Sequence, residues 1–574
     1  MPKSIFRILA FKCLRPTYPV GGELHYVSRM QRSLAKESRW YTFYNKASIS
    51  EDGRTVVIPN GFTEDTMLYD SGSISVSISA IVGENGSGKS SILDMMVRTL
   101  NNIATAFLGE KPQYAAAEHV HYIEYVYGSI LFLQGHEIKR IDVEGRKIQL
   151  VHYRICQGNG IAQNRAEYHV RNTELLLDAQ NNNVENLLSR RTQSMRKLAE
   201  FFYTIVCNYS IYAYNPDDYW EEYTNEERID KIRPKQNYLK YPYLRCWLTG
   251  LFHKNDGYQM PLVLNPMRTN GVINAPKENR LAKERLQSML FYKEDNNKNS
   301  NYYPFRIINK DHVIVGLSLN DLRDENYIWT RDWMIEKGLF GIRSRLYRDF
   351  ERISNEIVDY LVDMEGIDTN GAKHKLACRY VVYKILKIGK NYKKYNKILS
   401  NLRKANSSLD LLHHHIDELL YDYSHITMKL RRTLMYLESE MYDDGRQVYK
   451  LKDIEEKAKT FIADYNLFNE LPHRELADFL PPPIFDIEFQ IVKRENIDEN
   501  GNYNEQNIIP SWSLSSGQRQ IAYNISNFVY HVVNINSVHY NEVDVVAKLP
   551  LLKYKYINVI FDEIELYFHP DLQR

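Results

Sequence analysis

The strongest constraint on the fold of this chain is a glycine-rich octapeptide at residues 83–90, with the sequence Gly-Glu-Asn-Gly-Ser-Gly-Lys-Ser. An apolar run at 77–82 precedes it, and apolar residues at helical spacing follow it at 92–100. Glycines allow a backbone to curl so that several N–H groups point at phosphate oxygens in front of a helix. The strand–loop–helix order that these patterns predict is the setting of a phosphate-binding loop.

This loop predicts specific contacts to a nucleotide. The Lys89 ammonium would reach the β- and γ-phosphates, and the Ser90 hydroxyl would bind Mg²⁺. Residues expected to contact the nucleotide are Gly83, Asn85, Gly86, Ser87, Gly88, Lys89, Ser90 and Ser91.

A second motif stands near the end of the chain, where an apolar strand at 557–561 leads into Asp562 and Glu563. At a strand end, Asp562 would hold Mg²⁺ through water. Glu563 would orient or deprotonate the attacking water. The alternative reading is two solvated acids at a strand end, and the phosphate-binding loop upstream favours the functional interpretation.

A third motif, Leu-Ser-Ser-Gly-Gln at 514–518, precedes a helix whose apolar residues fall at 521, 525, 528, 529 and 532. Small residues at a helix N-terminus form an anion site, because the N–H groups there lack partners. The alternative reading is an ordinary serine-rich helix cap.

Together, and in their order along the chain (83–90, 514–518 and 562–563), the three motifs resemble those of the ABC-type head ATPases of the SMC/RecF/OLD group. The segment Asp-Glu-Ile-Glu-Leu-Tyr-Phe-His-Pro at 562–570 is similar to an extension found in RecF-like and OLD-like members. The likeness covers roughly 80–110 and 485–574. It implies an α/β P-loop NTPase head with a mixed sheet and an inserted helical arm, with ATP and Mg²⁺ as cofactors.

The resemblance also implies a homodimer, or a higher oligomer, in which two heads enclose two ATP molecules. Ser515, Gly517 and Gln518 would then serve the ATP held by the partner head. The family has a glutamine that senses the γ-phosphate, and Gln259 is the candidate here, although a glutamine in a surface loop is the alternative reading. Ser516 replaces the usual glycine of the signature, a change that we expect to be tolerated.

The residue pattern becomes helical near 342 and stops being helical near 480. It therefore divides the chain into an N-terminal lobe at 1–340, a helical arm at 341–480 and a C-terminal lobe at 481–574. We expect a β-meander at 119–155, a helix over 185–205 and one long helix over 409–437. Because family members continue beyond the second motif, we expect a longer protein, with room for an effector domain past Arg574.

Within the arm, residues 369–409 contain basic side chains and no acidic one. Tyrosines are interleaved with them, as in surfaces that contact a phosphate backbone. The alternatives are a solvated face or the docking surface of an acidic protein. The lysines expected to contact nucleic acid are Lys384, Lys387, Lys390, Lys393, Lys394 and Lys397.

Composition narrows the setting of the protein. The formal net charge is only +2, so a nucleic-acid surface must be local. No run approaches 18 apolar residues, which argues against a membrane span. Five cysteines lack a CxxC pair, and no signal-peptide pattern opens the chain, so we expect a cytoplasmic protein.

The resemblance extends to prokaryotic phage-defence ATPases, including those of Septu, retron-associated and PARIS-like systems. It implies an ATPase that senses DNA or a phage component and controls a nuclease or toxin effector. A RecF/SMC-like DNA-repair ATPase is the alternative. A transporter nucleotide-binding subunit is a second alternative. The insertion of more than 400 residues between the motif at 83–90 and the motif at 514–518 argues against it.

Overall fold

The computed structural model describes most of the chain, with gaps. The described residues are 5–15, 29–59, 76–84, 86–108, 122–123, 126–145, 147–156, 165–178, 201–215, 218–219, 247–252, 258–269, 271–293, 302–322, 324–392, 395–403, 409–439, 441–442, 445, 447–465, 474–498, 501–537 and 553–563.

The largest sheet has eight strands, all antiparallel to their neighbours, in the order β2-β1-β5-β6-β7-β8-β4-β3. Strands β5 to β7 confirm the meander within the expected range 119–155, and β8 extends it beyond that range. The first hairpin turns at Gly135, whose φ of 65° suits a two-residue loop. The strands are β1 (Phe6–Cys13), β2 (Trp40–Thr42), β3 (Ser48–Ile49), β4 (Thr55–Pro59), β5 (Tyr127–Gln134), β6 (Glu137–Glu144), β7 (Lys147–Cys156) and β8 (Arg165–Asp178).

A second sheet is parallel and has the order β10-β9-β17. It joins β9 (Phe202–Asn208) to β10 (Leu262–Asn265) and to β17 (Tyr556–Asp562), which comes from the other end of the chain. The expected helix at 185–205 is therefore wrong at its end, because the β-branched and aromatic residues from 202 onward pair with two strands.

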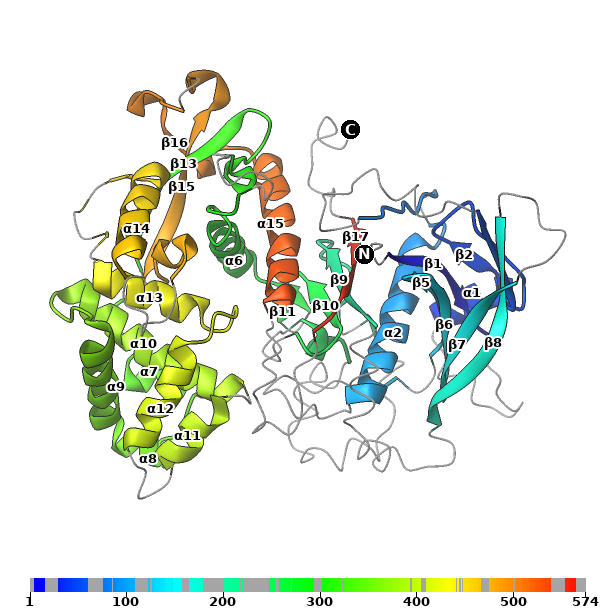
Figure 1. Cartoon of the computed structure of the whole chain (residues 1–574), viewed down its shortest axis with the longest axis horizontal. Coiled ribbons are helices and arrows are strands. Elements are labelled where there is room, and N and C mark those ends of the chain that lie inside the picture. The colour runs from blue at the N-terminus through cyan, green and yellow to red at the C-terminus, as the bar shows by residue number, and fades with distance from the viewer. Residues whose placement is uncertain are drawn as a thin grey trace.

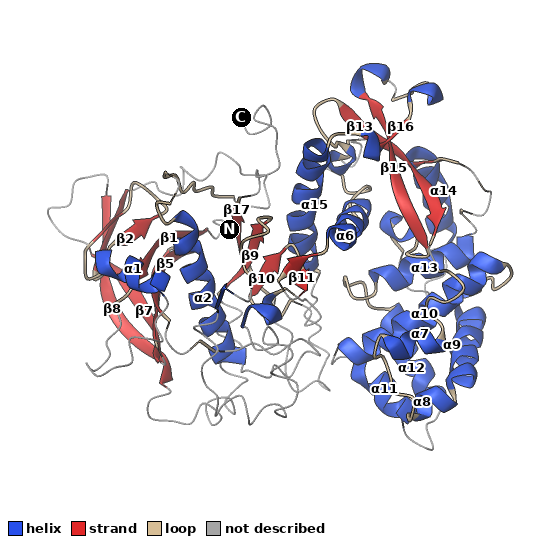
Figure 2. Ribbon diagram, turned by 180° about the vertical axis from the view of Figure 1, so that it is seen from behind, coloured by secondary structure: helices blue, strands red, loops and turns tan. Residues whose placement is uncertain are grey.

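Helix α2 (Lys89–Leu108) separates these two sheets and packs on both, as Figures 1 and 2 show. Nearly all its side chains from Ile92 onward are buried. The single mixed sheet that the family resemblance implies is absent from the described residues. Parallel and antiparallel strands lie in separate sheets, because the side chains of α2 fill the space between them. Helix α1 (Arg29–Glu37) also belongs to this part of the chain.

A second hydrophobic core runs from Leu286 to Ala522 and contains the helical arm. It begins before the expected boundary at 341 and takes in a four-stranded sheet, β14-β13-β15-β16, that links the arm to the expected C-terminal lobe. These strands are β13 (His312–Asp321), β14 (Tyr449–Lys450), β15 (Phe485–Lys493) and β16 (Ile509–Pro510), and the short hairpin β11 (Arg268–Thr269) and β12 (Val272–Ile273) precedes them.

The arm's helices are α7 (Arg331–Glu336), α8 (Arg345–Arg348), α9 (Phe350–Glu365), α10 (Ala372–Asn391), α11 (Asn396–Arg403), α12 (Leu409–Leu420), α13 (Met428–Ser439) and α14 (Leu451–Tyr465). Two further helices, α6 (Ala275–Gln287) and α15 (Ser516–Asn536), lie between the parallel sheet and the arm (Figures 1 and 2). None of the helices in the described ranges is both long and apolar enough to cross a membrane.

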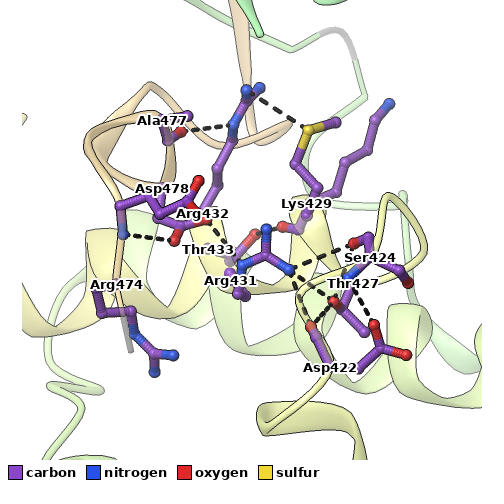
Figure 3. Close-up of polar contacts among 12 residues, drawn as sticks. Asp422, Ser424, Thr427, Lys429, Arg431, Arg432, Thr433, Arg474, Ala477 and Asp478 are labelled. Carbon is purple, nitrogen blue, oxygen red and sulfur yellow. Dashed lines mark hydrogen bonds and ion pairs between the residues drawn. The ribbon is translucent and has the colours of Figure 1, made fainter. Parts of the chain in front are cut away.

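The one long helix expected over 409–437 is broken into α12 and α13. At the break, the Asp422 carboxylate accepts a hydrogen bond from the Ser424 N–H, which favours a turn over a continuing helix. Arg431 then donates to the Asp422 carbonyl (3.0 Å) and pairs with Asp478 (2.9 Å), as Figure 3 shows. The buried guanidinium thus stabilises the turn from inside the arm.

Candidate nucleotide-binding site

The glycine-rich loop leads into α2, which begins at Lys89. Gly86 and Gly88 have φ angles of 80° and 89°, a region that glycine adopts without strain. The Lys89 ammonium crosses the loop and donates to the carbonyls of Gly83 (2.5 Å) and Glu84 (2.9 Å). The lysine thereby holds the loop curled at the helix start. Asn85 lies outside the described residues.

The surroundings of this loop leave room for a ligand. A Cβ at Gly83 would lie 2.6 Å from the Ser87 hydroxyl, whereas a Cβ at Gly86 would meet no atom within 4 Å. Ser87 and Ser90 are exposed, and Ser91 is half-buried. The serine hydroxyls expected to contact phosphate and Mg²⁺ are therefore accessible at the helix N-terminus.

The strand expected at 77–82 is wrong, because within the described chain this run pairs with no other strand. It lies beside the start of β1, where Arg7 donates to the Ile78 carbonyl (3.3 Å) and to the Ser79 hydroxyl. Ile78 and Val82 are 61% and 89% exposed. Arg7 thus hydrogen-bonds to a backbone carbonyl of the run 77–82, and apolar side chains of the run remain in contact with solvent.

The strand predicted to end in Asp562 and Glu563 is confirmed as β17. Asp562 is half-buried and stands opposite Asn208 in the register of β17 and β9. The Asn208 amide donates to the Asp562 carboxylate at 2.9 Å, and its carbonyl oxygen accepts from the Ser210 N–H at 2.8 Å. Glu563 is exposed and has a φ of 51°, so the backbone turns sharply straight after the aspartate.

The phosphate-loop helix and Asp562 converge on Tyr214. This tyrosine is buried with a φ of 51°. Burial, and then the carboxylates of Asp94 on α2 and Asp562 on β17, raise the pKa of its phenol. Asp94 lies one and a half turns after Lys89 and is fixed by Arg98 (2.9 Å). Asp94, shortly after the phosphate loop, and Asp562, more than 450 residues later in the sequence, therefore both act on the Tyr214 phenol.

Asn208 is a functional candidate that sequence reasoning missed. Its signal is a polar residue directly after a continuous apolar run, as at the end of a buried parallel strand. The helical interpretation of 185–205 concealed that signal. At the carboxyl edge of the sheet, Asn208 fixes the carboxylate expected to hold the metal.

The interpretation of Gln259 as the γ-phosphate sensor is wrong, and so is the alternative of a surface loop. Gln259 is buried, and its carbonyl accepts a hydrogen bond from Tyr554 (2.6 Å) just ahead of β17. This is the amino edge of the parallel sheet. Asp562 lies six residues along β17 from its first residue, or about 20 Å away at the spacing of a strand.

The third motif forms the N-terminus of α15. Ser515 is the N-cap and accepts from the Gln518 N–H (3.3 Å), while the Gln518 side chain accepts from the Ser515 N–H (3.2 Å). This reciprocal capping box confirms the reading as a helix cap and is compatible with an anion site. Ser515 is exposed, whereas Gly517 is buried.

The helix carries this cap away from the parallel sheet. Asn527 of α15 contacts Tyr209, the residue after β9, and Asn534 contacts Tyr258, ahead of β10. The helix therefore runs from the carboxyl edge toward the amino edge. Twelve residues separate Ser515 from Asn527, so the cap projects about 18 Å beyond the level of Tyr209 along the helix axis.

The basic segment 369–409 does not form one exposed face. Helix α10 is central to the arm, and its Tyr380 is buried, as is Tyr395 just beyond it. Lys373 pairs with Asp321 and with Glu325 (2.7 Å), so acids at the end of β13 and just after it balance this part of the segment. The tyrosines serve the core rather than a stacking surface.

The predicted nucleic-acid lysines also differ from one another. Lys384 is half-buried, and burial, then Lys387 and Lys429, lower its pKa to about 7, which makes it a poor phosphate contact. Lys387 donates to the Tyr383 hydroxyl (2.9 Å). Lys390 and Lys397 are exposed, although Lys390 also donates to the Gly338 carbonyl. Lys393 and Lys394 lie outside the described residues.

Comparison with known proteins found no matching family model, no matching curated protein and no matching solved structure.

Proposed function

We propose that this chain is a Mg²⁺-dependent ATPase of the ABC head type, a P-loop NTPase that hydrolyses ATP to ADP and phosphate. The observation that supports it best is that α2, which follows the glycine-rich loop, and β17, which ends at Asp562, pack in one hydrophobic core. An acidic strand end alone is a weak signal. The shared packing of these two segments, which lie far apart in the sequence, favours one site.

The roles follow from the donor set. Lys89 and the loop amides would bind the phosphates, and the Ser90 hydroxyl with the Asp562 carboxylate fits Mg²⁺, a hard cation that prefers oxygen. Bound Mg²⁺ would neutralise charge on the phosphate oxygens. Asn208 orients the Asp562 carboxylate. Glu563, next along the chain, would orient the attacking water and accept its proton.

The signature supports a shared site in a homodimer. Ser515 projects beyond the sheet edge on α15, and Ser515 and Ser516 are exposed at the helix N-terminus, whereas Gly517 is buried. A second copy would present this N-terminus to the ATP held by the first, with the exposed Ser515 facing the γ-phosphate. The dimer is thus the form that we expect to turn over ATP.

The test is Lys89→Ala, because the lysine both curls the loop and would contact the phosphates. Binding of a fluorescent ATP analogue with Mg²⁺ should fall at least tenfold in the full-length protein, while circular dichroism and Tm stay near wild type. Lys457→Ala on α14 is the matched control, an exposed lysine in the arm. Equal affinity in Lys89→Ala and Lys457→Ala would overturn the proposed nucleotide site.

We propose phage defence as the cellular role, with the ATPase sensing DNA or a phage component and controlling a nuclease or toxin effector. The family resemblance of the three motifs supports this role. Cytoplasmic location agrees with Cys13, Cys207 and Cys378, which are buried free thiols. Expression of the full-length protein with its neighbouring genes should lower phage plating, and Lys89→Ala should restore it.

DNA repair is the second candidate role, supported by the same resemblance. A nuclease or toxin gene beside this one favours defence, and replication genes favour repair. Unchanged phage plating together with sensitivity of a deletion strain to DNA damage would replace the defence role by repair.

A further inference from the structure

The face that α15 buries is polar. Its buried side chains include Asn524, Ser526, Asn527, His531 and Asn534. The apolar stripe expected to face the core is only half-buried, and Ile525 is 47% exposed. A buried polar interface needs every group paired, because an unpaired one costs free energy. The position of this helix therefore depends on specific hydrogen bonds.

The central bond of that face joins Asn527 to Tyr209. The Asn527 amide donates to the Tyr209 hydroxyl at 2.5 Å, and the Asn527 carbonyl oxygen accepts from Arg285 of α6. Arg285 pairs in turn with Glu278 of the same helix at 3.1 Å. Asn527 is 1% exposed, so the bond to Tyr209 is shielded from water.

Tyr209 is the chain neighbour of Asn208, whose side chain binds Asp562. One peptide unit therefore separates the residue that orients the Asp562 carboxylate from the residue that holds the signature helix. The contact of Asn208 with Asp562 and the contact of Tyr209 with Asn527 are therefore made by adjacent residues of one chain segment.

We propose that Tyr209 and Asn527 are positioning residues that transmit the state of the Asp562 site to the signature helix α15. This rests on the proposed function, since the state in question is the presence of Mg²⁺ and ATP. In this proposal α15 shifts when the contact between Asn527 and Tyr209 shifts. Ser515, about 18 Å further along the helix, moves with it.

The experiment uses hydrogen–deuterium exchange on the full-length protein, with and without Mg²⁺ and ATP. In wild type, ATP should slow exchange in the loop at 83–92 and change exchange along 516–536. Tyr209→Phe removes one hydroxyl and keeps the ring. It should leave the loop response within twofold of wild type and reduce the α15 response at least fivefold.

Two controls and a second variant separate coupling from damage. Tyr212→Phe, in the same loop but 83% exposed, and Asn536→Leu, exposed at the far end of α15, should respond as wild type. Asn527→Leu should reproduce Tyr209→Phe, and the double variant should be no worse than either single one, as expected for partners in one bond.

A turnover measurement gives an independent readout. Tyr209→Phe should keep KM for ATP within twofold and lower kcat at least fivefold, because ATP still binds while the signature is misplaced. The coupling would be overturned if α15 in Tyr209→Phe responded to ATP as strongly as in wild type. It would also be overturned if, in the wild-type protein, ATP slowed exchange in the loop without any change along α15. Absence of the loop response in wild type would instead overturn the proposed nucleotide site.

Discussion

The side-chain amide of Asn208 lies 2.9 Å from the Asp562 carboxylate, at the ends of two parallel strands whose residues are more than 350 positions apart in sequence. Since Asn208 also accepts from the Ser210 N–H, its amide is fixed with the N–H₂ group toward the acid. The carboxylate expected to hold Mg²⁺ is thus oriented by the neighbouring strand.

We predict that Asn208→Ala lowers the apparent affinity for Mg²⁺ in ATP hydrolysis. Loss of a partner that orients a metal ligand typically costs about 10- to 100-fold in metal affinity or activity. The measurement is a Mg²⁺ titration of ATPase activity at fixed ATP, in which the half-saturating concentration should rise. Asn172→Ala, on an exposed position of β8, is the control. A titration curve identical to that of the control would remove Asn208 from the site.

Glu563→Gln should bind ATP but hydrolyse it slowly. Removal of a positioned base costs on the order of 10²–10⁴-fold in rate, and the amide preserves size and shape. An ATP-bound dimer should therefore accumulate, visible by light scattering after gel filtration. Glu456→Gln, on an exposed face of α14, should turn over as wild type. If Glu563→Gln turns over normally, the base lies elsewhere, and Glu565 is the next candidate.

Heads that are defective in different motifs should complement each other. Lys89→Ala removes ATP binding in one head, and Ser515→Arg blocks the signature that serves the partner's ATP. Each variant alone should be inactive, whereas a mixture should form dimers with one intact composite site and recover part of the activity. The measurement is ATPase rate against mixing ratio in the full-length protein. Normal turnover by Ser515→Arg heads alone would contradict the shared site.

The half-buried Lys384 should make stability depend on pH. Its pKa is about 7 in the folded arm, below the ordinary value of 10.5. Between these values the unfolded chain binds a proton that the folded chain does not, so stability rises with pH from about 7 to about 10.5 and falls as pH decreases toward 7. Below about pH 7 both states bind the proton, so Lys384 no longer makes the free energy of unfolding change with pH.

We therefore predict that Tm of Lys384→Met changes less than that of wild type between pH 7 and pH 9, and that Tm of the variant is higher at pH 7. Lys457→Met, exposed on α14, should follow wild type at both values. Parallel Tm curves for Lys384→Met and wild type would show that Lys384 stays charged. Lys384 would then again be a candidate phosphate contact.

Local sequence determined the parts of this protein whose physical cause is local. The glycines of 83–88 specify a curled loop ahead of α2, Ser515 and Gln518 specify a helix cap, and the alternating strands after Tyr127 specify a meander. Each depends on backbone freedom, capping or periodicity within a few residues. The ending of β17 at Asp562 was readable for the same reason.

Only the tertiary structure decided which distant residues meet. Asn208 lies beside Asp562 because β9 pairs with β17. Gln259 lies at the opposite edge of that sheet, away from Asp562. Burial of α10 turned a basic segment into a core helix, since packing between helices depends on the faces that other segments present. A local pattern can indicate a buried strand, but which strands pair depends on contacts across hundreds of residues, so the local pattern does not specify the partner.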